Sequence, residues 1–465
     1  MLRVLMAALA LVSALSAQSK AVRDVDSEKG IQVSCRVENL DGDVIFDWDG
    51  ETSRVLASNV KLLTTSAALM ALPSDYRWTT KAVLDGSTLT LVGGGDPSIR
   101  LLGEEDIRKQ FLDGLAEALK QKGVSQLQRV VLDDRFFDRV YRHDLWPKDQ
   151  WQATYSAPVG GLVVEGGCIE LHGQRGQVQF VPSIGNAVQL KRSQTQNAST
   201  FTASWSKADE VLKVRGAPKK LWKLRFAVGN PVKFFGFWLQ DGLRKRGIPC
   251  ATVDLVEADD PPALGQTIWQ HQSAWTLQDA VIVANQHSDN FVSECLLKTL
   301  GAEKAGEGSV EAGAKVVAEI LAKQLDVDVD GLRQTDGSGF ARAKDNSANK
   351  ASPAMLCEML RAMAQQPQGR QLFESLPIAE HHRRLKKFFD QNVFKPQRVH
   401  AKTGWITGAS SLSGYLQTND QQTLVFSIVV NYTKDGTART NNSRFRRLQA
   451  QILADILNTP IPAKQ

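Results

Sequence analysis

A serine hydroxyl is a weak nucleophile until a base lies within hydrogen-bonding reach, and a lysine three residues later on the same helix face can be that base. Three tetrapeptides of the chain have this Ser-x-x-Lys spacing: Ser58 to Lys61, Ser204 to Lys207, and Ser347 to Lys350. Roughly two matches are expected by chance at this content of serine and lysine, so the flanking sequence has to decide between the three.

Ser58 alone stands at the start of a predicted helix. The residues from Val60 to Leu72 are apolar at helical spacing, and Pro73 ends the pattern. The free amides and the dipole at such a helix start can support an anion. Ser204 lies in a polar, strand-like stretch and Ser347 in a loop, so we interpret both as surface residues. The sequence therefore favours Ser58 as the nucleophile.

Two more motifs complete a constellation. Ser288-Asp289-Asn290 lies inside a predicted helical stretch from Ala280 to Leu300, and Lys402-Thr403-Gly404 begins a strand-like segment. Each tripeptide alone is typical of a helix cap, a turn or a strand end. Together with Ser58 and Lys61 they occur in the order that β-lactam-binding acyl transferases use.

With these motifs the sequence resembles the class C low-molecular-mass penicillin-binding proteins, D-Ala-D-Ala carboxypeptidase/endopeptidases related to β-lactamases. The resemblance extends from about residue 30 to residue 457. The further matches are Ala57, Lys61 to Leu69, Gly94 to Pro97, Val131 to Asp134, Trp146-Pro147, Tyr155 to Pro158, Asp336 to Gly339, and Ser410 to Tyr415.

The resemblance implies an α+β fold with a β-lactamase/transpeptidase-like domain, in which helices flank an antiparallel sheet. We assign this domain to residues 24–80 and 265–460. Residues 81–264 contain short alternating strands, glycine-rich turns and one amphipathic helix at about 104–122. They are predicted to be an inserted, mostly β region of one or two small subdomains.

The resemblance also implies the roles of the site residues. Ser58 attacks the carbonyl of the penultimate D-alanine, and Lys61 accepts its proton, which requires a pKa about 3 units below the ordinary value of about 10.4. Ser288 relays a proton to the leaving nitrogen, and Asn290 holds Lys61 and the substrate amide, with Asp289 beside it. Lys402 and Thr403 meet the substrate carboxylate. Gly404 leaves room for the substrate, and the amides of Ser58 and Trp405 form the oxyanion hole.

Three positions depart from the family pattern. Trp405 stands where the family usually has threonine or serine, which removes a hydroxyl and adds a bulky ring. Leu56 replaces a common proline. The segment from Ile378 to Leu385 replaces a glycine-rich Gly-Thr-Leu stretch, so a loop beside the site is altered. Its adjacent His381 and His382 point apart on either a helix or a strand, and spacing places no third ligand, so we predict no metal and no cofactor.

The composition and the N-terminus indicate the compartment of the protein and limit the partners that it can have. The chain has 465 residues, of which 42% are hydrophobic, and its net charge of +6 comes from scattered basic residues without a nucleic-acid-binding motif. Arg3, an apolar run to Leu15 and small residues predict a signal peptide over residues 1–17, hence an exported, periplasmic or extracytoplasmic protein without a membrane span. The expected partners are peptidoglycan stem peptides, with β-lactams as inhibitors. The five cysteines are predicted to be separate buried residues, with one bridge between distant segments left open, and the oligomeric state also stays open.

Two alternatives remain. A β-lactamase or esterase on the same fold would keep Ser58 and Lys61 but would need fast deacylation, and no Glu-x-x-Leu-Asn element is visible in the chain. A catalytically impaired wall-binding protein would explain Trp405 and the altered loop, although every side chain assigned to acylation is present. A peptidase is the preferred interpretation.

Overall fold

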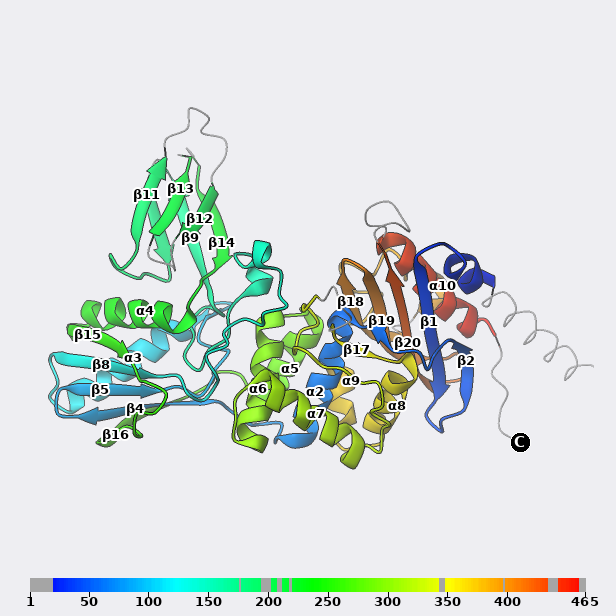
Figure 1. Ribbon diagram of the computed structural model, residues 1–465, viewed down its shortest axis with the longest axis horizontal. Helices are drawn as coiled ribbons and strands as arrows, with labels where there is room; N and C mark the ends of the chain where they lie inside the picture. Colours follow the sequence, from blue (N-terminus) through cyan, green and yellow to red (C-terminus); the bar gives the residue numbers. More distant parts are fainter. Residues whose placement is uncertain are drawn as a thin grey trace, which may run out of the picture. The chain divides into compact units, whose positions relative to one another are not determined.

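The computed structural model describes residues 20–174, 177–193, 202–206, 211–216, 220–342, 348–395, 398–433 and 442–459 (Figure 1). The predicted signal peptide, Lys207 and Ser347 lie outside these residues. The chain divides into two compact units, each assembled from separated segments. Unit 1 comprises residues 1–72, 281–289 and 314–465, and unit 2 comprises residues 73–280 and 290–313.

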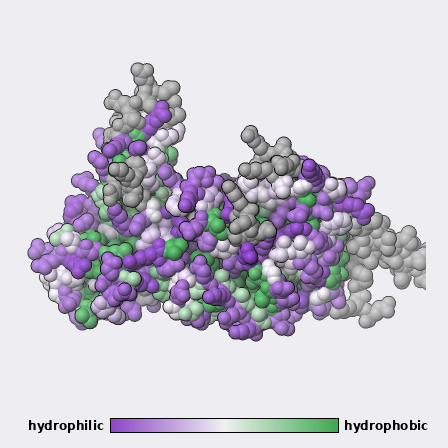
Figure 2. All heavy atoms as spheres, viewed as in Figure 1, coloured by the Kyte–Doolittle hydropathy of each residue, from purple (hydrophilic) through white to green (hydrophobic). Residues whose placement is uncertain are grey.

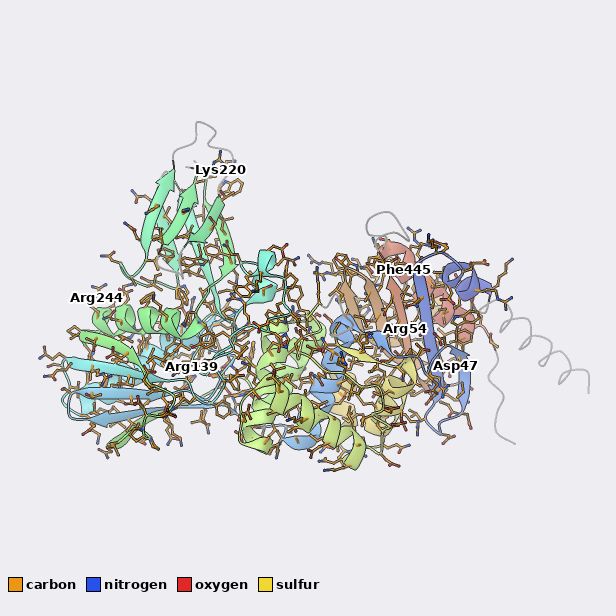
Figure 3. The ribbon with its side chains drawn as sticks, in the orientation of Figure 1. Asp47, Arg54, Arg139, Lys220, Arg244 and Phe445 are labelled. Carbon is orange, nitrogen blue, oxygen red and sulfur yellow. The ribbon has the colours of Figure 1, made fainter. Side chains whose placement is uncertain are left out.

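Unit 1 is built on an antiparallel sheet whose strand order is β18-β19-β20-β1-β2 (Figure 1). The strands are β1 (Ile31–Asn39), β2 (Val44–Trp48), β18 (Val399–Ile406), β19 (Ala409–Gln417) and β20 (Thr423–Tyr432). Alternate residues of β20 join the same core as helix α10 (Asn442–Leu457), whose Phe445 is labelled in Figure 3. Helix α8 (Pro353–Ala364) packs against β20 and β1. With helices against it, β20 is apolar almost throughout rather than alternating.

The remaining elements of unit 1 surround the predicted nucleophile. A short 3-10 turn, η1 (Ala57–Asn59), leads into helix α2 (Val60–Ala71), which is buried along nearly its whole length. Helix α9 (Gly369–Ser375) packs against α2. The other elements are β3 (Arg54–Val55), β17 (Lys350–Ala351), η4 (Asn392–Phe394), the end of α5 (Leu277–Gln286) and most of α7 (Val310–Gln324).

Unit 2 has its own core around a mixed sheet of strand order β15-β8-β5-β4-β16. The strands are β4 (Thr79–Asp85), β5 (Thr88–Val92), β8 (Leu127–Asp133), β15 (Cys250–Leu255) and β16 (Gln266–Gln272). Helices α3 (Ile107–Gln121) and α4 (Pro231–Lys245) bury their apolar faces in that core. Helix α6 (Asn290–Ala305) also belongs to unit 2.

Two further sheets in unit 2 have the strand orders β10-β9-β14 and β11-β13-β12. Their strands are β9 (Cys168–Gln174), β10 (Gln177–Val181), β11 (Gln189–Ser193), β12 (Thr202–Ser206), β13 (Val211–Arg215) and β14 (Trp222–Ala227). The small elements are β6 (Leu101–Leu102), β7 (Glu105–Asp106), η2 (Lys148–Gln150) and η3 (Thr154–Ser156).

Two of the helices expected from the sequence are present, and a third is interrupted. The helix after Ser58 and the helix near residues 104–122 are confirmed. The continuous helix from Ala280 to Leu300 is wrong: α5 ends at Gln286 and α6 begins at Asn290. Ser288, between them, has a φ of 55°, a conformation that no helix interior contains.

The boundaries of the two units differ from the predicted division at residues 81 and 264. Residues 73–80, 265–280 and 290–313 group with unit 2 by their contacts. That residues 81–264 form an insert of one or two subdomains stays a prediction.

The cysteines do not form disulfide bonds, and the face of the molecule drawn in Figure 2 is mainly polar. None of the five cysteines, all of which lie in the described part of the chain, is in a disulfide; four of them are buried, and Cys250 is partly exposed. The face drawn in Figure 2 is largely hydrophilic, with small hydrophobic areas scattered over it. Among the described residues, no helix combines the length and the apolar character that crossing a bilayer requires.

Candidate active site

Ser58 and Lys61 lie together at the start of helix α2. The Lys61 Nζ donates a hydrogen bond to the Ser58 Oγ over 3.2 Å, and the lysine side chain is completely buried. The three-residue spacing places both side chains on one helix face, as the tetrapeptide predicted. This pair can transfer a proton directly.

The backbone before Ser58 is tightly held. Ala57 has a φ of 48°, in the left-handed region that non-glycine residues rarely adopt, and such strain persists only where the surroundings enforce it. On one side Ser411 Oγ donates to the carbonyl of Leu56 over 2.6 Å, and on the other Asn59 Nδ2 donates to Ser413 Oγ over 2.6 Å. Both serines belong to β19, so the sheet positions the start of α2.

Lys61 has a second anchor in the segment that contains Asp336 to Gly339. Its Nζ donates to the carbonyl oxygen of Ser338 over 2.5 Å. The buried Asp336 carboxylate shapes this turn by accepting the backbone N–H groups of Ser338 at 3.1 Å and Gly339 at 2.5 Å. Gly339 has a φ of 80°, and a Cβ there would lie 2.9 Å from the Ser58 nitrogen. This turn, which the family resemblance included, therefore contacts both members of the pair.

Lys402 and Ser288 form a second lysine–serine pair. The Lys402 Nζ donates to Ser288 Oγ over 2.8 Å and to the carbonyl of Thr403 over 2.9 Å. Ser288 is brought to this point because Asn285, at the end of α5, donates to Thr65 Oγ1 of α2 and to Ser375 Oγ of α9. The two motifs, more than a hundred residues apart in the chain, thus meet within unit 1.

Positive charge accumulates around Lys402. Burial lowers the pKa of Lys402 well below its ordinary value, and the nearby charges of Lys61, Arg446 and Arg384 act in the same direction. Because like charges and desolvation both disfavour the protonated amine, the site is poised to receive a negative group.

Strand β18 runs directly beside the Ser58 backbone. A Cβ at Gly404 would lie 3.0 Å from the Ser58 nitrogen and 2.7 Å from the Leu56 oxygen, and it would also meet Ser411 Oγ. This close approach explains the glycine. The buried Arg446 of α10 donates a hydrogen bond to the carbonyl oxygen of Gly404 over 2.8 Å. Trp405 follows on the strand, and 47% of its surface is exposed.

A cavity of about 680 Å³ opens beside Lys402 and Thr403. It is lined by the end of α5, the segment from Glu374 to Arg384 and the first half of β18. The altered loop identified in the sequence is therefore a wall of this cavity.

The structure brings together most of the predicted site residues. Ser58, Lys61, Ser288, Lys402, Thr403 and Gly404 form the cluster described above. Asp289 follows Ser288 in the break between the helices. Asn290 belongs to unit 2, where its Nδ2 donates to the carbonyl of Tyr155 over 2.9 Å, and its contact with Lys61 stays a prediction. Ser204 lies on the exposed part of strand β12.

Sequence reasoning missed Ser338, whose carbonyl holds Lys61, and Arg446, whose guanidinium holds β18. The Asp336 motif was a signal for the first of these, whereas nothing in the sequence marks an arginine of the last helix. His381 and His382 line the cavity, and in the described part of the chain no group of three or more histidine, cysteine or carboxylate side chains converges as metal ligands.

Solved structures share the fold of this chain. Penicillin binding protein 4 from Haemophilus influenzae has a TM-score of 0.77 at 21% identity, covering 95% of this chain and 99% of that one. A predatory endopeptidase from Bdellovibrio bacteriovorus, in complex with an immunity protein, has a TM-score of 0.53 at 13% identity and covers 94% and 96% of the two chains. The α+β fold predicted from the sequence is confirmed.

Sequence comparison identifies the family. The chain is 29% identical over 434 residues to a D-alanyl-D-alanine carboxypeptidase of Actinomadura sp. strain R39, covering 85% of this chain and 76% of that one. Residues 18–452 match the D-Ala-D-Ala carboxypeptidase 3 (S13) family, and the chain belongs to that family. It is a serine peptidase of the carboxypeptidase/endopeptidase kind, as the sequence motifs predicted.

Proposed function

We propose that Ser58 is the acylated nucleophile of this peptidase and that Lys61 is its base. The observation that carries the proposal is the hydrogen bond of 3.2 Å between Lys61 Nζ and Ser58 Oγ, at the start of a buried helix that strand β18 contacts. A nucleophile and a base within this reach satisfy the first geometric requirement of covalent catalysis.

The reaction begins on the carbonyl of the penultimate D-alanine. Ser58 Oγ bonds to the carbonyl carbon while its proton passes to Lys61 Nζ. The peptide C–N bond then breaks, and the departing nitrogen takes a proton through Ser288. A water molecule hydrolyses the resulting ester, which frees the acid product and restores the Ser58 hydroxyl.

The backbone amides of Ser58 and Trp405 hold the oxyanion in this scheme. Their roles are supported by the approach of Gly404 to the Ser58 nitrogen, which puts the two amides on adjoining segments. Lys402 and Thr403 receive the carboxylate that follows the scissile bond, and Lys402 then gains the negative partner that its buried position lacks. Asn290, with Asp289 before it, steadies the substrate amide.

The substrate we propose is a peptidoglycan stem peptide, cleaved after its penultimate D-alanine. A terminal D-alanine leaves in the carboxypeptidase reaction, and a cross-linked amine leaves in the endopeptidase reaction. Residues 1–17 would direct the chain out of the cytoplasm to reach this polymer. The relatives named above are consistent with such a substrate.

Covalent labelling tests the nucleophile. Incubation of the full chain with a fluorescent penicillin should leave a long-lived label, and Ser58→Ala should abolish it. The matched control is Ser204→Ala, which removes the serine of another Ser-x-x-Lys tetrapeptide on strand β12 and should label normally. A label that persists in Ser58→Ala would disprove the assignment, and rapid release of the label would favour a β-lactamase.

Digestion of purified muropeptides tests the reaction. Mass spectrometry should detect loss of terminal D-alanine or cleavage of cross-links, and the ratio of the two separates carboxypeptidase from endopeptidase activity. If the folded protein neither releases D-alanine nor cleaves cross-links, the result would contradict the proposed substrate and favour the wall-binding alternative.

A further inference from the structure

The cavity beside Lys402 has an unusual concentration of positive and potentially positive groups. Its described lining includes Lys402, Arg383, Arg384 and four histidines, although the whole chain has only seven histidines. The carboxylate in that lining is Glu374, which pairs with Arg370 over 2.7 Å. A cavity with this balance attracts anions.

The loop that supplies most of these groups is fastened to the sheet. The backbone of Ala379 donates to Val399, and that of Ala401 donates to Pro377, over 2.9 and 3.0 Å. Past the arginines, Leu385 is buried in the core of unit 1. With backbone pairing at one end and a buried anchor at the other, the loop presents its cations from a defined position.

His382 is the side chain of this loop that the surroundings perturb most clearly. Burial lowers its pKa, as do the charges of Lys402, Arg384, Arg446 and Arg383. Its Nδ1 is buried without a hydrogen-bond partner among the described residues. The neighbouring carboxylate, Glu380, accepts the backbone N–H of Arg398 over 2.7 Å through Oε1 and interacts electrostatically with His381. Four cations therefore act on one imidazole beside the cavity.

The direction of the substrate places its leaving part in this cavity. A peptide antiparallel to β18, with its reacting carbonyl between the amides of Ser58 and Trp405, continues past Thr403 and Lys402 toward His400. Lys402, Thr403 and His400 line the cavity. Its volume of about 680 Å³ lies within the range of about 300–1,000 Å³ that encloses drug-sized ligands, far more than one alanine requires.

We infer that this cavity binds the segment after the scissile bond and selects leaving groups that carry a second carboxylate. Lys402 takes the carboxylate next to the scissile bond, and Arg383 and Arg384 take the additional one. The inference rests on the proposed function and extends it: the favoured substrate is an anionic, extended leaving segment rather than a lone D-alanine.

The test uses three acyl peptides that differ only in the leaving residue, namely D-Ala-D-Ala, D-Ala-D-Glu and D-Ala-D-Gln. D-Glu and D-Gln have nearly the same shape, so the ratio of their kcat/KM values isolates the second charge. The full chain should prefer D-Glu by about three- to tenfold, because partly exposed ion pairs contribute modestly, and added salt should reduce the preference. Arg383→Gln/Arg384→Gln should bring the ratio near one.

The matched control is Lys386→Gln/Lys387→Gln, which removes two cations from the same segment but outside the cavity lining, and it should retain the ratio. The single variants Arg383→Gln and Arg384→Gln should each lower the ratio part of the way, and they guard against misfolding of the double variant. Equal D-Glu to D-Gln ratios in the two double variants would overturn the inference, as would no preference in the unmodified chain. If D-Ala-D-Ala is still cleaved in either case, the proposed function stands. Failure to cleave any of the three peptides would overturn both.

Discussion

Replacing Gly404 with alanine should damage acylation far more than it damages the fold. The new Cβ would lie 3.0 Å from the Ser58 nitrogen and 2.7 Å from the Leu56 oxygen, and neither backbone atom can rotate away as a flexible side chain can. Overpacking of this kind costs about 1–3 kcal/mol of unfolding free energy. The displaced Ser58 amide is one of the two proposed oxyanion donors, and loss of such a donor typically slows catalysis by about 100- to 1000-fold.

The assay is the second-order rate constant for labelling by a fluorescent penicillin, measured beside the free energy of unfolding. Gly404→Ala should lower the labelling rate at least about 100-fold. Gly404→Ala/Ser411→Gly should not recover it, because the second change removes only the side-chain contact and leaves both backbone contacts. The control is Gly236→Ala in α4, where the Cβ would meet only side-chain atoms of Leu132 and Val253 at 3.1 Å. Labelling of folded Gly404→Ala within about threefold of the unmodified chain would refute the reasoning.

Three other substitutions test the electrostatics and packing of the two units. Lys402→Met should abolish substrate turnover yet stabilise the ligand-free fold, because it removes a buried charge surrounded by cations. Between the lowered pKa of Lys402 and about 10.5, the folded state binds fewer protons than the unfolded state, so stability should rise with pH in this window by at most about 1.4 kcal/mol per pH unit. Denaturation of Lys402→Met at matched pH values should lack this contribution. Lys298→Ala should cost about 3 kcal/mol in chemical denaturation, because it leaves Asp138 and the Val140 carbonyl without their buried partner. Trp405→Thr should raise kcat/KM for D-Ala-D-Ala by about three- to tenfold, because the added hydroxyl can bind the substrate carboxylate. An unchanged value would contradict that role for the hydroxyl, and a lower value would assign the exposed ring a favourable role.

The two helices around Ser288 illustrate how far sequence reasoning reached. Apolar spacing from Ala280 to Leu300 favoured one helix, since periodicity reports which residues are buried and not whether the backbone is continuous. The structure interrupts the helix at Ser288, which adopts a φ of 55° and accepts a hydrogen bond from Lys402. The contacts of Asn285 with α2 and α9 hold the end of α5 at this point. Tertiary contacts overrode local propensity at that point.

The sequence by itself determined the family, the α+β fold and the pairing of Ser58 with Lys61. The family and the fold follow from a resemblance that motifs along the whole chain carry. The pairing of Ser58 with Lys61 is local, because a three-residue spacing in a helix puts both side chains on one face. Only the tertiary structure decided what surrounds the pair. The Ser338 carbonyl on Lys61, Arg446 behind β18 and the cationic loop beside Lys402 come from segments far apart in the chain, and their meeting depends on how the sheet and helices of unit 1 pack, which no local spacing encodes.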